Sequence, residues 1–378
     1  MDNNCNWLNY LCIYDINAKD IDRYAVKFLN LETPPKLMIL EDCKEYNTYR
    51  KIGKFKDFEN LVCVSWFSIK KLISLLKENK IKYLLIDAHR IPDVHIIIAA
   101  KHLNIKIFYI QHGMYIPFMK RTYSLFIKKF VKTIRYLYYT IDDAFYLKDF
   151  SFIKRMIDVH IFGKSRTLLD KYNIFPNNGA VYSKYWEKWH KTHYRFIHTK
   201  MFIMGNQDFN KFRFLKKLSG EYIAYCYQSL LEDGRISKND MYEFYNELQK
   251  WSLKNKKKVI VKVHPVANEL YLKDLQDLFG FELEYSNIPN TDVVIGHYSS
   301  LLPFWGINGR KVITVKLPGH DIHESISSWS FSVSKLNDVV LDKVPNVDAN
   351  LCKYYFSNKV LTGTEIKSKF LEDYNEDK

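Results

Sequence analysis

The chain has 378 residues, of which 47% are hydrophobic and 16% aromatic, and it carries a formal net charge of +15 at pH 7. This length suffices for two domains whose cores need no disulfide or structural metal. Six cysteines without paired or CxxC spacing argue against a disulfide scaffold and a zinc site. The start lacks the pattern of a signal peptide, and no run of about eighteen apolar residues occurs, so we expect a soluble cytoplasmic protein.

The first half of the chain alternates short apolar runs with helical patterns. Buried strands are predicted at 7–14, 36–40, 61–65, 83–86 and 106–110, and helices at 68–79 and 92–103. This alternation indicates parallel βαβ units in a doubly wound sheet. Gln111 and His112 follow the fifth strand, where we expect contacts to an acceptor across a cleft. His112 would be an acceptor contact or a proton shuttle, or else an ordinary turn histidine.

The stretch 119–138 combines basic and apolar residues at helical spacing. It contains no acid, and its basic residues are Lys120, Arg121, Lys128, Lys129, Lys132 and Arg135. A helix with one apolar-aromatic face can lie in the headgroup region of an anionic bilayer. A core-facing helix with a solvated basic face would have the same pattern. No RNP-like strand, zinc spacing or GXXG clamp supports nucleic-acid binding, so we expect none.

The rest of the chain predicts a second domain of the same kind. Residues 145–200 read as irregular and aromatic-basic, as the acceptor side or a domain-closing helix, and the boundary falls near 205–220. A strand is predicted at 200–204, before the boundary. Beyond it, strands are predicted at 221–227, 258–263, 281–284, 292–295 and 311–316, with helices at 239–254, 267–278 and 299–307. Two Rossmann-type domains facing a central cleft give a GT-B-like α/β fold. We expect an acceptor-side domain at 1–205, a ligand-binding domain at 206–350, and a helix with a polar tail at 351–378.

Three polar constellations follow predicted strands of the second domain. They are Gln228 with Glu232-Asp233-Gly234, then Lys262 with His264-Pro265, then Gly296 with Ser299-Ser300. Ligands of open α/β sheets bind outside the carboxyl ends of the strands. An acid pair, a histidine and a hydroxyl pair are what a site needs to hold a nucleotide phosphate beside a reacting carbon.

Each constellation also has an ordinary explanation. His264 can donate to a phosphate oxygen with Lys262 adding charge, or it can be a turn histidine. The serines open a predicted helix, where hydroxyls and free N–H groups favour an anion, although a simple N-cap explains one of them. One of Glu232 and Asp233 would act as base or nucleophile at a sugar carbon, and solvated loop carboxylates are the alternative. Glu324 would hold the ribose or the base, or belong to a surface loop.

The order of these motifs resembles that of bacterial capsule and surface-polysaccharide glycosyltransferases and their relatives, the sialyl-, pseudaminyl- and Kdo-transferases. These enzymes use CMP-activated ulosonic acids and share acid-acid-Gly, His-Pro and Ser-Ser/Thr motifs. Here the motifs would be Glu232-Asp233-Gly234, His264-Pro265 and Ser299-Ser300. The resemblance covers about residues 200–320 and departs from the family at Lys311, where a proline is usual.

The resemblance implies a CMP-sugar donor whose phosphate contacts His264 and the serines. The acid pair lies close before His264 in sequence, which is similar to retaining Kdo-type enzymes with a carboxylate nucleophile. No metal or other cofactor is expected, because the CMP leaving group carries one phosphate. The acceptor would be a capsule or surface glycan, lipid-linked at the inner face of the plasma membrane. The alternatives are a CDP-polyol phosphotransferase of the teichoic-acid type and a non-catalytic nucleotide-sugar-binding protein of capsule assembly.

Overall fold

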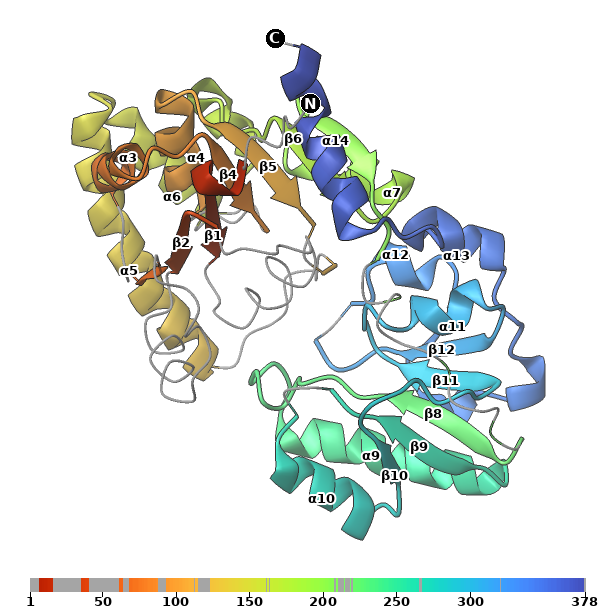
Figure 1. Cartoon of the computed structure of the whole chain (residues 1–378). Coiled ribbons are helices and arrows are strands. Elements are labelled where there is room, and N and C mark those ends of the chain that lie inside the picture. Colours follow the sequence, from red (N-terminus) through yellow and green to blue (C-terminus); the bar gives the residue numbers. More distant parts are fainter. Residues whose placement is uncertain are drawn as a thin grey trace. The chain divides into compact units, whose positions relative to one another are not determined.

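The structure is a computed structural model of the chain. It describes residues 7–15, 35–40, 61–63, 68–87, 93–111, 113–114, 123–160, 162, 164–206, 209, 214, 218, 220–264, 267–319 and 321–376. The chain divides into two compact units (Figure 1). The first unit comprises 1–112, 130–204 and 361–378, and the second comprises 113–129 and 205–360. The chain therefore passes into the second unit twice, at Gly113 and at Gly205, and returns at Phe130 and at Leu361.

A parallel sheet of seven described strands forms the centre of the first unit, in the order β3-β2-β1-β4-β5-β6-β7 (Figure 1). The strands are β1 Leu11–Asp15, β2 Leu37–Leu40, β3 Leu61–Cys63, β4 Tyr83–Ile86, β5 Lys106–Ile110, β6 Asn178–Val181 and β7 Lys200–Ile203. All four residues of β4 are buried, as expected for a strand covered on both faces by helices. The strand order reverses between β1 and β4, which defines a doubly wound sheet.

The helices of the first unit are α3 Ile69–Glu78, α4 Asp93–His102, α6 Ser151–His160, α7 Lys184–His193 and α14 Gly363–Glu376, together with α5 Tyr123–Tyr146 from Phe130 onward. Two 3-10 helices, η1 Trp7–Tyr10 and η3 Arg166–Tyr172, complete the described elements. Ser68 begins α3 because its hydroxyl accepts a hydrogen bond from the Lys71 N–H at 3.4 Å. The predicted basic helix at 119–138 corresponds to α5, which continues to Tyr146; residues 119–122 lie outside the described part.

Two predictions for the first half need correction. The strand predicted from residue 7 begins at Leu11, after the 3-10 helix. The irregular stretch predicted at 145–200 is wrong, because α6, β6 and α7 lie there. In α7, Ser183 caps the helix, and Trp186, Trp189 and His190 are buried on one side of it. Aromatic residues have modest helix propensity, so the burial of this face outweighs the local signal.

The second unit contains a parallel sheet of six described strands, in the order β10-β9-β8-β11-β12-β13 (Figure 1). The strands are β8 Tyr222–Cys226, β9 Lys258–Lys262, β10 Glu282–Glu284, β11 Val293–Gly296, β12 Lys311–Val315 and β13 Phe331–Val333. Its helices are α9 Lys238–Lys254, α10 Glu269–Asp277, α11 Pro303–Ile307, α12 Glu324–Ser327 and α13 Ala349–Phe356, with 3-10 turns η4 Leu336–Asp338 and η5 Leu341–Lys343. The prediction of two Rossmann-type domains is confirmed, and only β13 among these strands was not predicted.

Helix α9 shows how the sequence forms the core of this unit. Ser237 caps its start, and its buried residues recur at the spacing of one helix face: Met241, Phe244, Tyr245, Leu248 and Trp251. The Trp251 indole N–H donates to the Val339 carbonyl at 2.9 Å. Each of the larger apolar side chains contributes about 2 kcal/mol through burial, which fixes α9 against the sheet.

The end of the chain differs from the predicted helix with a polar tail. Two helices occupy 349–376, and α14 belongs to the first unit while α13 belongs to the second. Thr362 and Glu365 form a capping box, since each side chain accepts from the other residue's N–H. Phe370 of α14 stacks on Phe108 at 4.7 Å between ring centroids, which secures this helix to β5.

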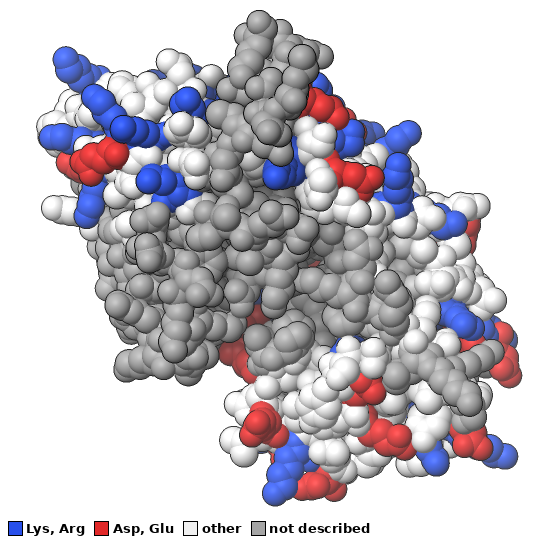
Figure 2. Space-filling view, viewed as in Figure 1, with Lys and Arg blue, Asp and Glu red and all other residues white. Residues whose placement is uncertain are grey.

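On the face that Figure 2 shows, charged side chains of both signs are interspersed among the described residues. Several form ion pairs, such as Arg310 with Asp292 at 2.6 Å and Lys316 with Asp321 at 2.5 Å. Exposed pairs of this kind are solvated and screened by salt, so they matter less for stability than the cores. In the part of the chain that the structure describes, no helix has the length and apolar character needed to cross a membrane.

Candidate functional site

The carboxyl edge of the second sheet brings together the loops that follow β8, β9 and β11. The strand order reverses between β8 and β11, and ligands of doubly wound sheets bind at such a switch point. The Gln228 side-chain oxygen, after β8, accepts a hydrogen bond from the Tyr298 N–H, after β11, at 3.0 Å. This bond joins the first and third predicted constellations across the switch point.

Glu232 connects the loop after β8 to the start of α10. Its Oε1 accepts from the Tyr227 hydroxyl at 2.8 Å and from the Asn268 N–H at 2.9 Å. Its Oε2 is shielded from solvent and has no hydrogen-bond partner among the described residues. Burial, with Tyr245 and Glu232 nearby, raises the pKa of Tyr227 far above its usual range. Tyr227 therefore remains a hydroxyl donor to this carboxylate.

Asp233 differs from its neighbour because its side chain is 46% exposed. Its carboxylate lies 3.2 Å from Arg235 Nε. Between them Gly234 has a φ of +64°, a left-handed conformation that glycine adopts without strain, and it closes the turn with an N–H bond to the Leu231 carbonyl. The turn thus holds an accessible carboxylate beside a guanidinium.

Arg235 is a candidate that the sequence analysis missed. Its side chain hydrogen bonds to the Tyr298 hydroxyl. Burial raises the pKa of Tyr298 to about 12, although Arg235 acts in the opposite direction and lowers it. The guanidinium therefore joins the same two loops as the Gln228 bond. Its position directly after Glu232-Asp233-Gly234 was the available signal, because a cation beside an acid pair is suited to an anionic ligand.

His264 and Lys262, both predicted to meet a phosphate, lie in different environments. His264 is half-buried after β9, and its carbonyl accepts from the Ala267 N–H at 3.0 Å. Lys262 is only 3% exposed, and its amine donates to the Tyr285 carbonyl at 2.6 Å. Burial lowers the pKa of Lys262, and Glu284 opposes this. Lys262 thus serves the packing of β9 against β10, while Pro265 lies outside the described residues.

The two serines lie in a turn rather than in a helix. The helix predicted at 299–307 begins only at Pro303, because turns occupy 299–302. Ser299 Oγ accepts from the Leu301 N–H at 3.2 Å, and the Ser300 carbonyl accepts from Asn206. A Cβ on Gly296 would lie 2.9 Å from Leu302, so glycine permits this turn to approach β11.

A thiol lies beneath the serine turn. Burial raises the pKa of Cys226 to about 11, while a hydrogen bond from Ser299 and the charge of Lys262 lower it. In the strand register Cys226 is the partner of Lys262. Ser299, which follows β11, therefore lies beside the end of β8, where Cys226 pairs in register with the last residue of β9.

The remaining predicted residues lie elsewhere. Gln111 is 2% exposed in the first unit, and its side-chain oxygen accepts from the Tyr182 N–H at 2.9 Å, which joins the ends of β5 and β6. His112 lies outside the described residues. Glu324 is an exposed first residue of α12, between β12 and β13. Within the described residues, no group of three His, Cys, Asp or Glu side chains could hold a metal ion.

Comparison with known proteins gives structural matches. No protein-family model matches the chain, and no curated protein matches it by sequence. A calicheamicin glycosyltransferase superimposes with a TM-score of 0.50 at 8% identity, covering 96% of this chain and 98% of that one. The chain has a GT-B-like fold.

Two other matches have lower TM-scores. The UDP-GlcNAc 2-epimerase from Methanocaldococcus jannaschii gives 0.48 at 10% identity, over 96% of this chain and 99% of that chain. A UDP-glucosyltransferase from Polygonum tinctorium gives 0.41 at 11% identity, over 97% and 93% of the two chains. At these identities the likeness concerns the fold alone and does not extend to the chemistry of the second sheet's edge.

Proposed function

We propose that the protein is a glycosyltransferase that moves an ulosonic acid from a CMP-sugar onto a capsule or surface glycan. The observation that carries the proposal is the hydrogen bond from Tyr298 to Gln228, which spans the switch point of the second sheet. Around it lie the acid pair after β8 and the serine turn after β11. The donor would bind at this edge.

Arg235, His264 and the serine hydroxyls would receive the phosphate of the donor. A guanidinium offers paired donors to a phosphate or carboxylate, and a CMP-ulosonate carries one of each. Fixed donors at this position would stabilise the charge that develops on CMP as the glycosidic bond breaks. The Ser299 hydroxyl is held by Cys226 and Leu301, so Ser300 is the more available of the two.

Asp233 is the carboxylate that we assign to the reaction. Its side chain is exposed, whereas Glu232 Oε1 already accepts two hydrogen bonds and Oε2 is shielded. In a retaining reaction, Asp233 would attack the anomeric carbon while the bond to the CMP phosphate oxygen breaks and CMP takes the electron pair. The acceptor hydroxyl would then displace the carboxylate and lose its proton to a base. Glu232 would position the loop through Tyr227 and Asn268.

A thermal-shift panel with CMP, CDP, UDP and GDP tests the donor. A ligand at 100 times its Kd stabilises the folded state by about 2.7 kcal/mol, so CMP should raise the Tm by several degrees. Arg235→Gln should reduce the shift produced by CMP, whereas Arg310→Gln, which removes a guanidinium paired with Asp292 in the same unit, should leave it unchanged.

The panel also separates the alternatives. Stabilisation by UDP or GDP without any by CMP would contradict the proposed donor. Stabilisation by CMP together with polyol-phosphate transfer from a CDP-linked donor would favour the phosphotransferase. Binding of CMP without any transfer, in the presence of donor and acceptor, would favour a non-catalytic assembly protein.

A further inference from the structure

The carboxyl-terminal half of α5 has one face that packs and one that remains exposed. Its buried residues are Tyr136, Thr140, Asp143 and Ala144. Its exposed large apolar residues are Ile134 at 52%, Tyr138 at 70%, Ile141 at 43% and Phe145 at 64%. The exposed set follows the 3-4 spacing of a single helix face, so these side chains form a continuous row. Contiguous apolar surface of this kind marks an interaction site.

Buried polar contacts fix which face of α5 points outward. Asp143 Oδ1 accepts from the Ile69 N–H at 2.6 Å, and Asp143 Oδ2 contacts His95 Nδ1 of α4. Both the aspartate and the histidine are buried. Rotation of the helix to hide its apolar row would leave these groups buried without their partners, which is costly. The exposed row therefore stays outward.

The row continues around the corner between α5 and α6. Phe145 and Phe150 meet edge to face with ring centroids 5.0 Å apart, and Phe150 is 59% exposed. We call Ile134, Tyr138, Ile141, Phe145 and Phe150 the α5 stripe. Its last two residues form an exposed aromatic pair at the corner.

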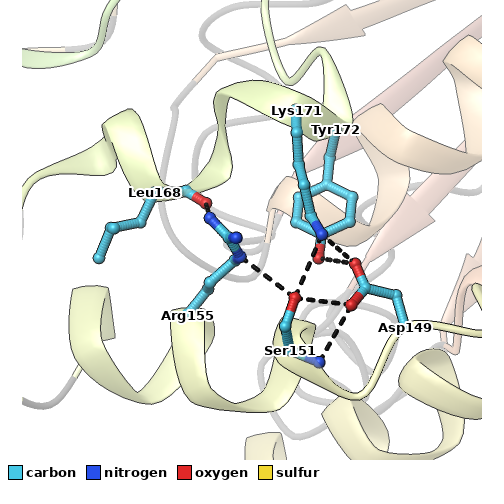
Figure 3. A network of polar contacts seen from close by, with 6 residues as sticks. All are labelled: Asp149, Ser151, Arg155, Leu168, Lys171 and Tyr172. Atoms are coloured by element: carbon cyan, nitrogen blue, oxygen red, sulfur yellow. Dashed lines mark hydrogen bonds and ion pairs between the residues drawn. The ribbon is translucent and has the colours of Figure 1, made fainter.

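A hydrogen-bond network around Asp149 holds this corner (Figure 3). Asp149 accepts from the Ser151 N–H at 3.0 Å, from the Tyr172 hydroxyl at 2.6 Å and from Lys171. Hydrogen bonds from Lys171, Ser151 and Tyr172 keep the pKa of Asp149 well below its usual range. Arg155 extends the network to the Leu168 carbonyl at 2.9 Å. The corner is thus ordered before any partner binds.

The sequence before the stripe is strongly basic. No acid occurs from Gly113 to Ile141. This region contains Lys120, Arg121, Lys128, Lys129, Lys132 and Arg135, and the first acid after it is the exposed Asp142. Lys148 is exposed at the corner itself. A second copy of the chain would bring these like charges together, whereas anionic headgroups would neutralise them.

We propose that the α5 stripe docks on an anionic phospholipid bilayer, with its apolar side chains at the boundary between headgroups and acyl chains. Amphipathic helices with basic flanks bind membranes in this way, and aromatic side chains favour the interface. The stripe lies mostly beyond the stretch 119–138 that the sequence indicated. The proposal does not depend on the transfer reaction, since vesicle binding needs neither donor nor acceptor.

Vesicle flotation of the full chain tests the proposal. We expect binding to vesicles of phosphatidylcholine with phosphatidylglycerol, weaker binding to phosphatidylcholine alone, and a decline as salt rises. The double variant Phe145→Ser with Phe150→Ser should bind about tenfold more weakly, because it removes two apolar anchors. The matched control is Leu253→Ser with Leu270→Ser, which changes residues 69% and 71% exposed in the second unit and should bind like the wild type.

Three outcomes would overturn the proposal. One is equal vesicle binding by the two double variants, and another is binding that ignores lipid charge and salt. The third is that the wild-type protein does not bind vesicles but sediments as a dimer, and that the Phe145→Ser/Phe150→Ser variant sediments as a monomer. This result would assign the stripe to contact with a second copy of the chain. Thermal unfolding shows that each variant folds, and an unchanged CMP shift shows that the second unit is intact.

Discussion

Two glutamines make the same kind of bond in the two units, with different consequences. Gln111 follows β5 and accepts from the Tyr182 N–H at 2.9 Å, while Gln228 follows β8 and accepts from the Tyr298 N–H at 3.0 Å. Gln111 is buried and joins adjacent strands away from the strand-order reversal. Gln228 is half-buried and spans that reversal. The same bond is a packing contact in one unit and part of a candidate site in the other.

Other polar groups of the two units follow the same distinction between buried and accessible positions. In the first unit, His190 accepts from the Tyr109 hydroxyl at 2.8 Å and donates to the Trp186 carbonyl at 2.6 Å, all within the interior. In the second unit, His264 is half-buried and Asp233 is exposed. Polar groups satisfied internally stabilise a fold, whereas accessible ones can meet a ligand.

The largest expected effect tests the accessible carboxylate. Asp233→Ala should lower kcat/KM for glycosyl transfer by about a thousandfold or more, because the attacking group is lost, and CMP should still stabilise the variant. Asp277→Ala, a surface acid at the end of α10, is the control and should retain activity. Loss of transfer in Glu232→Ala but not in Asp233→Ala would move the reacting role to the neighbouring carboxylate.

The next effect concerns the buried histidine of the first unit. Burial lowers the pKa of His190 from 6.5 to about 4, with His193 adding to the shift. The unfolded chain therefore binds a proton that the folded chain excludes, so stability is full above about pH 6.5 and falls as the pH drops towards 4, by about 2–3 kcal/mol. Urea unfolding at pH 7 and pH 4.5 measures this loss. It should shrink in His190→Gln, and an unchanged loss would assign the titration to other groups.

The smallest effect separates the two glutamines. Gln228→Ala should weaken CMP binding about tenfold, because the Tyr298 N–H loses its partner and the loops at the switch point are no longer joined. Gln111→Ala should instead lower stability by about 1–3 kcal/mol, since it leaves a buried N–H unpaired, and should not change CMP affinity. Calorimetric titration and thermal unfolding of both variants give the comparison. Similar effects of the two substitutions on CMP affinity would break it.

The sequence by itself determined the fold class. Apolar runs of strand length between helical patterns predicted two parallel sheets, because a strand buried on both faces has a continuous apolar sequence. The strands at 83–86 and 106–110 have the predicted bounds. The prediction for 145–200 was wrong because helix α7 is rich in aromatic residues. Their burial depends on contacts with distant residues, such as that of Tyr109 with His190.

Only the tertiary structure decided which polar residues lie accessible at the candidate site and which are buried. The sequence predicted ligand contacts for Lys262, Gln111 and Glu232. In the structure, however, Lys262 donates to a carbonyl 23 residues away, and Glu232 accepts from an N–H 36 residues away. Arg235 became a candidate through its contact with Tyr298, which lies on another loop. Periodicity reports the local environment of the backbone, whereas the direction of a long polar side chain depends on which distant strand ends beside it.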